Sequence, residues 1–109
     1  NLDIKDKESA KIISKSANKM VGDICIVGEP NSDGEIEIGY GTYDEFQRQG
    51  FMTEAVGGMI LWAKSQSNIS SIIASTEKEN IASFTILQKN NFLKVGETEI
   101  LYHWKLKLN

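Results

Sequence analysis

The chain has 109 residues, of which 40% are hydrophobic and 25% charged, and its formal net charge is -3. That length supports one hydrophobic core, so we predict a single domain over residues 1–109. The acidic balance argues against nucleic acid or an anionic membrane as the main partner, and no apolar run approaches the ~20 residues of a membrane span. One cysteine, one histidine and no leader-like segment predict a cytoplasmic protein without disulfides or a metal site.

The first half of the chain is predicted to form strands. Residues 10–15 and 20–27 have the length and the intervening polar turn of a β-hairpin. A second group of turn residues follows at 29–34. In residues 35–42 isoleucines alternate with glutamates, which is typical of a strand with one apolar face and one carboxylate-bearing face.

Helical spacing first appears between residues 53 and 65, where one apolar stripe contains Val56, Met59, Ile60 and Ala63. A buried strand is predicted over 70–75 and a second helix over 80–90. That helix should turn three side chains toward the core, namely Ala82, Ile86 and Leu87. Two strands close the chain, and in the last one every second residue from 100 to 108 is apolar or aromatic. Together these elements predict an α/β (α+β) domain with two helices packed on a mixed, mainly antiparallel sheet.

The segment from Gln47 to Ala55 joins the third strand to the first helix. The first N–H groups of a helix have no intrahelical acceptor and its dipole is positive there, so a helix start of this kind binds anions. Gly50 lets the backbone approach a ligand closely. The segment therefore predicts a phosphate-bearing cofactor, although it is not a nucleotide P-loop, because Phe51 and Met52 stand where Lys and Ser or Thr would be required.

A Ser-His-Asp triad fits less well. It would have to use His103, which the alternation of the last strand places on that strand's polar face. We therefore do not predict triad chemistry.

Three motifs, in the right order, resemble the GNAT superfamily of acetyl-CoA-dependent N-acetyltransferases, and within it the Rim-type branch that includes acetyltransferases of ribosomal-protein N-termini. They are the strand at 35–41, the loop Gln47-x-x-Gly50-x-Met52-Thr53-Glu54-Ala55, and Asn80-x-Ala82-Ser83 with Lys89-x-Asn91-Phe92. The resemblance extends from residue 10 to residue 108 and implies a GNAT-like fold with acetyl-CoA as cosubstrate. Family domains begin with a further strand and helices, so an N-terminally shortened GNAT domain is expected here.

The resemblance also implies where coenzyme A would bind. Backbone amides of the loop would hold the pyrophosphate, and the strand near Gly41 would splay from its neighbour to admit the pantetheine arm. Met52 stands where the family has Gly or Ala, so its side chain must point away from the phosphates or into the core. Asn91 replaces a usual Gly and tolerates a left-handed backbone. The implied cofactor-binding residues are Gly41, Thr42, Gln47, Arg48, Gln49, Gly50, Phe51, Met52, Thr53, Asn80 and Ser83.

Two catalytic candidates follow from the same resemblance. Ser83 would protonate the departing thiolate, because Leu87 stands where many relatives carry a tyrosine; the alternative is a serine bonded back to its own helix. Glu37 would take the proton from the amine, directly or through water, and the alternative is a solvent-facing strand carboxylate. A backbone N–H near Thr42 would stabilise the developing oxyanion.

Two functions remain open from the sequence. The first is an acetyltransferase acting on a primary amine, such as a small molecule or a protein or peptide N-terminus. The second is a catalytically reduced coenzyme A-binding or interaction module. In addition, the first strand would lie at a sheet edge, which predicts association with a second copy of the chain.

Overall fold

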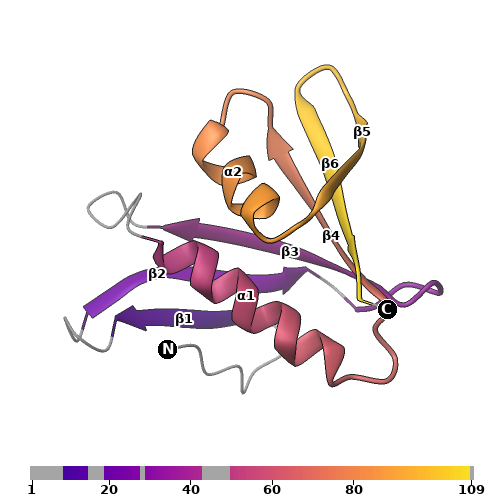
Figure 1. The fold of residues 1–109 in the computed structure, drawn as a ribbon, viewed down its shortest axis with the longest axis horizontal. Coiled ribbons are helices and arrows are strands. Elements are labelled where there is room, and N and C mark those ends of the chain that lie inside the picture. Colours follow the sequence, from indigo (N-terminus) through magenta and orange to yellow (C-terminus); the bar gives the residue numbers. More distant parts are fainter. Residues whose placement is uncertain (1–8, 15–18, 28, 43–49, 109) are drawn as a thin grey trace.

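A computed structural model describes residues 9–14, 19–27, 29–42 and 50–108. Its strands are β1 (Ser9–Ser14), β2 (Lys19–Val27), β3 (Glu35–Thr42), β4 (Ser71–Glu77), β5 (Leu93–Glu97) and β6 (Leu101–Lys107), and its helices are α1 (Phe51–Lys64) and α2 (Ile81–Lys89). The six strands form one sheet in the order β1-β2-β3-β4-β6-β5. In Figure 1, α1 crosses β1 to β3 and α2 lies beside β4. The predicted α/β (α+β) architecture is confirmed.

The element boundaries agree with the predicted ones to within two residues. Two shifts reach two residues: β4 ends at Glu77 rather than at Ser75, and α1 begins at Phe51 rather than at Thr53, directly after the capping residue Gly50. Helix ends are the least certain part of any pattern-based prediction, since the first turn carries little periodicity. The described part of the chain has no helix that is both long and apolar enough to cross a membrane.

The sheet contains one parallel pair, β3 with β4, and this pair is short. The paired residues are Glu35 with Ser71, Ile36 with Ile72, and Glu37 with Ile73. Beyond Glu37 the two strands diverge, as the open V between them in Figure 1 shows. The remaining neighbours are antiparallel. The splay expected near Gly41 is therefore present, and the structure places its start after Glu37.

The hydrophobic core lies between one face of the sheet and the two helices. Strand residues Ile36 and Ile38 are 1% and 3% exposed, and Val56 of α1 and Leu87 of α2 are both 0% exposed. Burial of side chains of this size stabilises a fold by about 1.5–3 kcal/mol each. The indole N–H of the buried Trp104 has a hydrogen-bond partner, since Nε1 donates to Thr76 Oγ1 over 2.9 Å.

One predicted core residue is wrong. Ala82 is exposed, whereas Leu87 is buried and Ile86 is partly buried. At 100° per residue, Ala82 is rotated about 140° from Leu87 around the helix axis and therefore points away from the core. Phe84, three residues before Leu87, packs against the core instead.

The opposite face of the sheet carries polar pairs between neighbouring strands. Glu35 of β3 forms an ion pair with Lys105 of β6, with 2.7 Å between Oε2 and Nζ. Ser75 Oγ lies 2.9 Å from Nδ1 of His103, which pairs with it across β4 and β6. His103 is therefore on the polar face, as its alternation predicted.

Candidate active site

A cavity of about 560 Å³ opens where the end of β3 meets the beginnings of both helices. Its lining comes from three segments of the chain that are far apart in sequence. The lining residues are Tyr40, Gly41, Gly50, Phe51, Met52, Thr53, Asn80, Ile81, Ala82, Ser83, Thr85, Ile86 and Lys89. The volume falls in the range of about 300–1,000 Å³ that is typical of small-molecule sites.

The beginning of α1 presents its backbone to this cavity. Gly50 caps the helix with φ 80° and its carbonyl oxygen accepts the first helical bond from Glu54 N over 3.0 Å. The amides of Met52 and Thr53, which precede that bond, have no acceptor within the helix. The positive φ favours glycine, and a Cβ built on Gly50 would meet no heavy atom of the described residues within 4 Å. The helix start is thus open to a ligand.

Met52 lines the cavity but is almost fully buried. The residue is only 3% exposed and belongs to the core cluster. Its bulk is therefore directed away from the ligand side of the loop. A larger residue than the family's usual Gly or Ala is accommodated without filling the cavity.

The beginning of α2 forms another side of the cavity. Asn80 caps this helix, and its Oδ1 accepts a hydrogen bond from Ser83 N over 3.2 Å. Two helix N-termini therefore face one cavity, and each carries a partial positive charge. Lys89 adds a full positive charge to the lining. Such a site is electrostatically suited to phosphate groups.

Tyr40 and Ser83 bring two hydroxyl groups together in the cavity lining. Tyr40 Oη donates to the backbone carbonyl oxygen of Ser83 over 2.8 Å, and Ser83 Oγ donates to Tyr40 Oη over 3.3 Å. Burial raises the pKa of Tyr40 above its ordinary value, an effect that the hydrogen bond with Ser83 opposes. The phenol is therefore protonated at neutral pH.

The structure brings together many of the residues predicted for the cofactor, and the lining includes Gly41, Gly50, Phe51, Met52, Thr53, Asn80 and Ser83. Thr42 ends β3 next to Gly41 and pairs with Gly22. Gln47, Arg48 and Gln49 lie outside the described residues. Leu87, the position of the family tyrosine, is fully buried.

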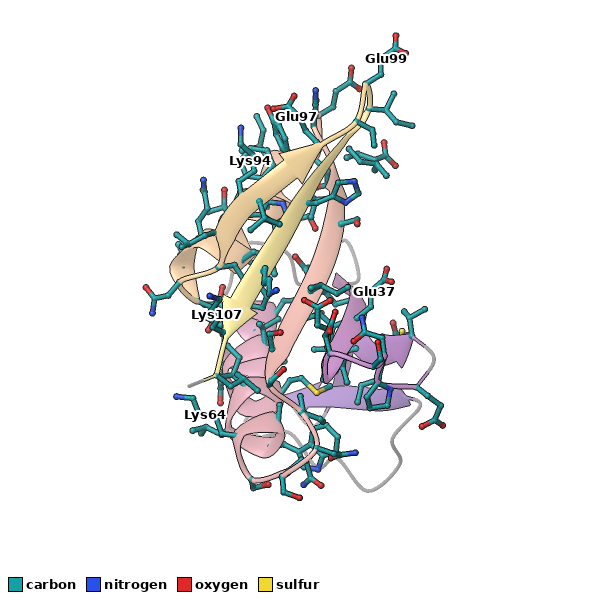
Figure 2. All side chains as sticks on the ribbon, turned by 90° about the vertical axis from the view of Figure 1, so that its right-hand side faces the viewer. Glu37, Lys64, Lys94, Glu97, Glu99 and Lys107 are labelled. Atoms are coloured by element: carbon teal, nitrogen blue, oxygen red, sulfur yellow. The ribbon has the colours of Figure 1, made fainter. Side chains whose placement is uncertain are left out.

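Glu37 lies outside the cavity lining. Its side chain is exposed and alternates with the buried Ile36 and Ile38, so it projects from the sheet face opposite the helices. Figure 2 shows Glu37 on the side of β3 away from α1. Along β3 it is the last residue paired with β4, so it stands where the split begins.

Sequence reasoning missed several lining residues on α2. Ala82, Thr85, Ile86 and Lys89 follow the spacing i, i+3, i+4 and i+7, which places them on one face of the helix. This spacing was available in the sequence, but its alanine and isoleucine were assigned to the core. Tyr40 shares the face of Ile36 and Ile38 and therefore points toward the helices.

The chain matches a known protein family. Residues 3–93 match the family model described as the acetyltransferase (GNAT) domain. Since this match spans most of the chain, the protein belongs to the GNAT acetyltransferase family. It is similar to the uncharacterized N-acetyltransferase YjdG of Bacillus subtilis (strain 168), with 33% identity over 93 residues, or 85% of this chain and 55% of that protein.

Solved structures share the fold. A GNAT-family acetyltransferase from Bacillus anthracis has a TM-score of 0.84 at 18% identity, over 93% of this chain and 66% of that one. Ribosomal-protein-S5-alanine acetyltransferase from Vibrio fischeri has a TM-score of 0.81 at 20% identity, over 93% of this chain and 61% of that one. Spermidine N-acetyltransferase from Vibrio cholerae, in complex with CoA and spermine, has a TM-score of 0.76 at 15% identity, over 96% of this chain and 69% of that one. The chain spans about half the length of the curated relative that it matches.

Proposed function

We propose that this domain transfers an acetyl group from acetyl-CoA to a primary amine. The observation that carries the proposal is the cavity beside the splayed end of β3, onto which two helix N-termini open. Membership of the GNAT family supports the same reaction. The proposal also explains why β3 and β4 stop pairing after Glu37, since an extended pantetheine arm could bond to the backbone groups that the split leaves unpaired.

The site fits the phosphate end of coenzyme A. The backbone amides of Met52 and Thr53 would hold the pyrophosphate, and the missing Cβ of Gly50 leaves room for it. By resemblance, Gln47, Arg48, Gln49 and Phe51 contribute to the same loop. Asn80, whose Oδ1 already caps α2, retains an NH2 group that can donate to the arm. Gly41 and Thr42 would present β3 backbone to it.

Glu37 is the proposed base. A free α-amine has a pKa of about 7.7–8.0 and a lysine about 10.4, so an acceptor amine must lose a proton before it attacks. Glu37 projects from the face opposite the helices, at the point where the split begins. Beyond it, the same face of β3 carries only Gly39 and Gly41, which leaves space for an amine beside the strand.

Ser83 is the proposed proton donor to the thiolate that leaves. Ser83 lines the cavity from the first turn of α2, close to the helix N-terminus. The oxyanion that develops on the acetyl carbonyl would be stabilised by a backbone N–H of β3 near Thr42. No covalent participation by the protein is required.

We infer that the acceptor is a protein or peptide N-terminus, as in the Rim-type branch. The sequence motifs support this branch, and the similarity to a ribosomal-protein-S5-alanine acetyltransferase is compatible with it. A polyamine is the competing acceptor, because the fold is equally that of a spermidine N-acetyltransferase. The net charge of -3 suits either cationic acceptor.

Two measurements test the function. Calorimetry with coenzyme A reports binding, and thiol release from acetyl-CoA in the presence of peptides, polyamines and aminoglycosides reports transfer. Glu37→Gln and Ser83→Ala should each abolish most turnover while coenzyme A still binds. Glu99→Gln is the matched control, since Glu99 is exposed between β5 and β6, far from Glu37 in Figure 2. Binding without turnover on any amine would instead assign a coenzyme A-binding module, and absence of binding would refute the proposal.

We also propose that the chain associates with a second copy. β1 is an edge strand of the sheet, so one side of its backbone has no strand partner within the described residues. Pairing of two such edges would satisfy these groups. Sedimentation at micromolar concentration should show a dimer, and a monomer would contradict this.

A further inference from the structure

The hydroxyl of Tyr40 contacts the proposed proton donor in two ways. It donates to the Ser83 carbonyl oxygen over 2.8 Å, and it accepts from Ser83 Oγ over 3.3 Å. Both residues line the cavity, and both are only partly buried. Tyr40 comes from the splayed part of β3, beyond the last residue that pairs with β4. The phenol is therefore held beside Ser83 and within reach of the same ligand.

The two hydroxyls differ in acidity. A serine hydroxyl is a much weaker acid than a thiol, so a Ser83 that protonated a thiolate alone would be left as an unstable alkoxide. A phenol ordinarily has a pKa of about 10 and an alkyl thiol about 8.5; burial raises the pKa of Tyr40, but its mismatch with the thiol remains smaller than that of serine. Proton donation is efficient when donor and acceptor are closely matched in pKa. The chemistry therefore favours the phenol as the source of the proton.

We propose that Tyr40 and Ser83 form a proton relay, in which Tyr40 supplies the proton that Ser83 delivers to the departing thiolate. This inference rests on the proposed acetyl transfer. In the relay the tyrosine comes from β3. Many relatives carry a tyrosine on the helix instead, at the position that Leu87 occupies here. Leu87 is fully buried and cannot reach the cavity, whereas Tyr40 lines it.

The relay balances without a further reactant. As the carbon–sulfur bond breaks, its electron pair stays on sulfur, and the sulfur takes the proton of Ser83 Oγ. Ser83 Oγ in turn takes the proton of Tyr40, after that hydroxyl has rotated from the Ser83 carbonyl oxygen to Oγ. The resulting phenolate regains a proton from water, and the proton lost by the amine leaves through its own base.

The surroundings keep the phenol in the form that the relay needs. Burial raises the pKa of Tyr40, so it remains protonated at neutral pH. Its cross-strand partner on β2 is the apolar Ile24, and the apolar Phe51 lines the same cavity from the start of α1. Among the described residues that line the cavity, Lys89 alone carries a charge. As a cation it would stabilise a transient phenolate.

The first test uses coenzyme A as the probe and does not depend on turnover. Ultraviolet absorbance of the thiolate is followed against pH, with the complex of desulfo-coenzyme A as the blank for tyrosine ionisation. Hydrogen-bond donors near the sulfur favour the thiolate, so the bound thiol should have a lower pKa than free coenzyme A. Tyr40→Phe keeps the ring and removes the hydroxyl, and should raise the pKa of the bound thiol by about one, a tenfold change in ionisation.

Tyr102→Phe is the matched control. Tyr102 packs against Phe84 and Trp104 on the helix side of β6, and it is not one of the described residues that line the cavity. Its hydroxyl should leave the bound thiol unaffected. If Tyr40→Phe does not fold, as judged by its melting temperature, Ser83→Ala removes the other member of the pair and should raise the pKa of the same thiol.

Turnover provides the second test. With acetyl-CoA and the amine that the wild type acetylates fastest, Tyr40→Phe should lower kcat by about tenfold to hundredfold while the Kd for coenzyme A stays unchanged. The Tyr40→Phe/Ser83→Ala double variant should be no slower than the slower single variant, since both groups act in one chain.

Two results would overturn the relay. In one, the bound thiol titrates alike in wild type and Tyr40→Phe; in the other, Tyr40→Phe weakens coenzyme A binding with kcat unchanged, which would leave the phenol a merely structural contact to α2. These outcomes are distinct from failure of the proposed function. If the wild-type protein does not bind coenzyme A, both the proposed acetyl transfer and the relay are refuted. If it binds coenzyme A but Tyr40→Phe has no effect on the bound thiol or on kcat, only the relay is refuted.

Discussion

Asn90, at the end of α2, donates a hydrogen bond from Nδ2 to the carbonyl oxygen of Thr53, in the first turn of α1, over 3.2 Å. The same Nδ2 donates to the Ile86 carbonyl oxygen over 3.0 Å, so one amide group links the two helices. Thr53 and Ile86 both line the cavity. The Asn90 amide therefore sets the spacing of the two helices that hold the candidate cofactor site.

Replacing Asn90 with alanine should loosen this link. Loss of two partly buried hydrogen bonds is expected to lower the free energy of unfolding by about 1–2 kcal/mol. The affinity for coenzyme A should fall as well, because α1 and α2 no longer keep their spacing. Urea denaturation and calorimetry measure the two effects. Gln88→Ala, on an exposed position of the same helix, should change neither, and equal stability of the two variants would contradict the role given to Asn90.

Gly50→Ala should weaken both the fold and the cofactor site. An alanine at φ 80° costs about 1–2 kcal/mol, and its methyl group would project into open space beside the cavity. Gly57→Ala is the contrasting change, since Gly57 lies inside α1 and an added Cβ would meet its nearest neighbour, Asn90 Oδ1, at an ordinary 3.5 Å. That variant should gain about 0.5–1 kcal/mol and bind coenzyme A normally. Thermal unfolding with and without coenzyme A distinguishes the two.

The left-handed residue Asn91 can be tested in both directions. Its φ of 68° confirms the turn predicted before Phe92. Asn91→Gly should retain or slightly raise stability, whereas Asn91→Val should lose about 1–2 kcal/mol because a β-branched side chain is strained at this φ. Denaturant midpoints report the difference. Equal midpoints for the glycine and valine variants would show that the turn relaxes.

Acid should remove the contribution of Glu35. Hydrogen bonds from Lys105 Nζ, over 2.7 Å, and from Asn31 Nδ2, over 3.0 Å, hold the pKa of Glu35 below its ordinary value of 4.5. Because the folded-state pKa is the lower one, the stabilisation is fully present above pH 4.5 and is lost as the pH falls through the folded-state value. Glu35→Gln should therefore melt a few degrees below the wild type at neutral pH and at the same temperature in strong acid. Glu99→Gln, an exposed glutamate, should show no such gap, and a gap that persists in strong acid would contradict this account.

Local patterns in the sequence were sufficient for most of the fold. Alternation predicted β3 and β6, and helical spacing predicted α1, because each pattern is encoded by neighbours within a few residues. The loop around Gly50 and the turn at Asn91 could also be predicted from the sequence, since a positive φ restricts which residues are tolerated. The assignment of Ala82 failed because propensity and hydrophobicity do not say which face of a short helix meets the sheet.

By itself, then, the sequence determined the elements, their apolar faces and a helix start suited to phosphate. Only the tertiary structure decided that β3 leaves β4 after Glu37, that Asn90 reaches Thr53, and that the hydroxyls of Tyr40 and Ser83 meet across 43 residues of chain. Such contacts depend on how α2 docks against the sheet. Docking is set by the summed packing of the whole core, and no local window of residues contains that information.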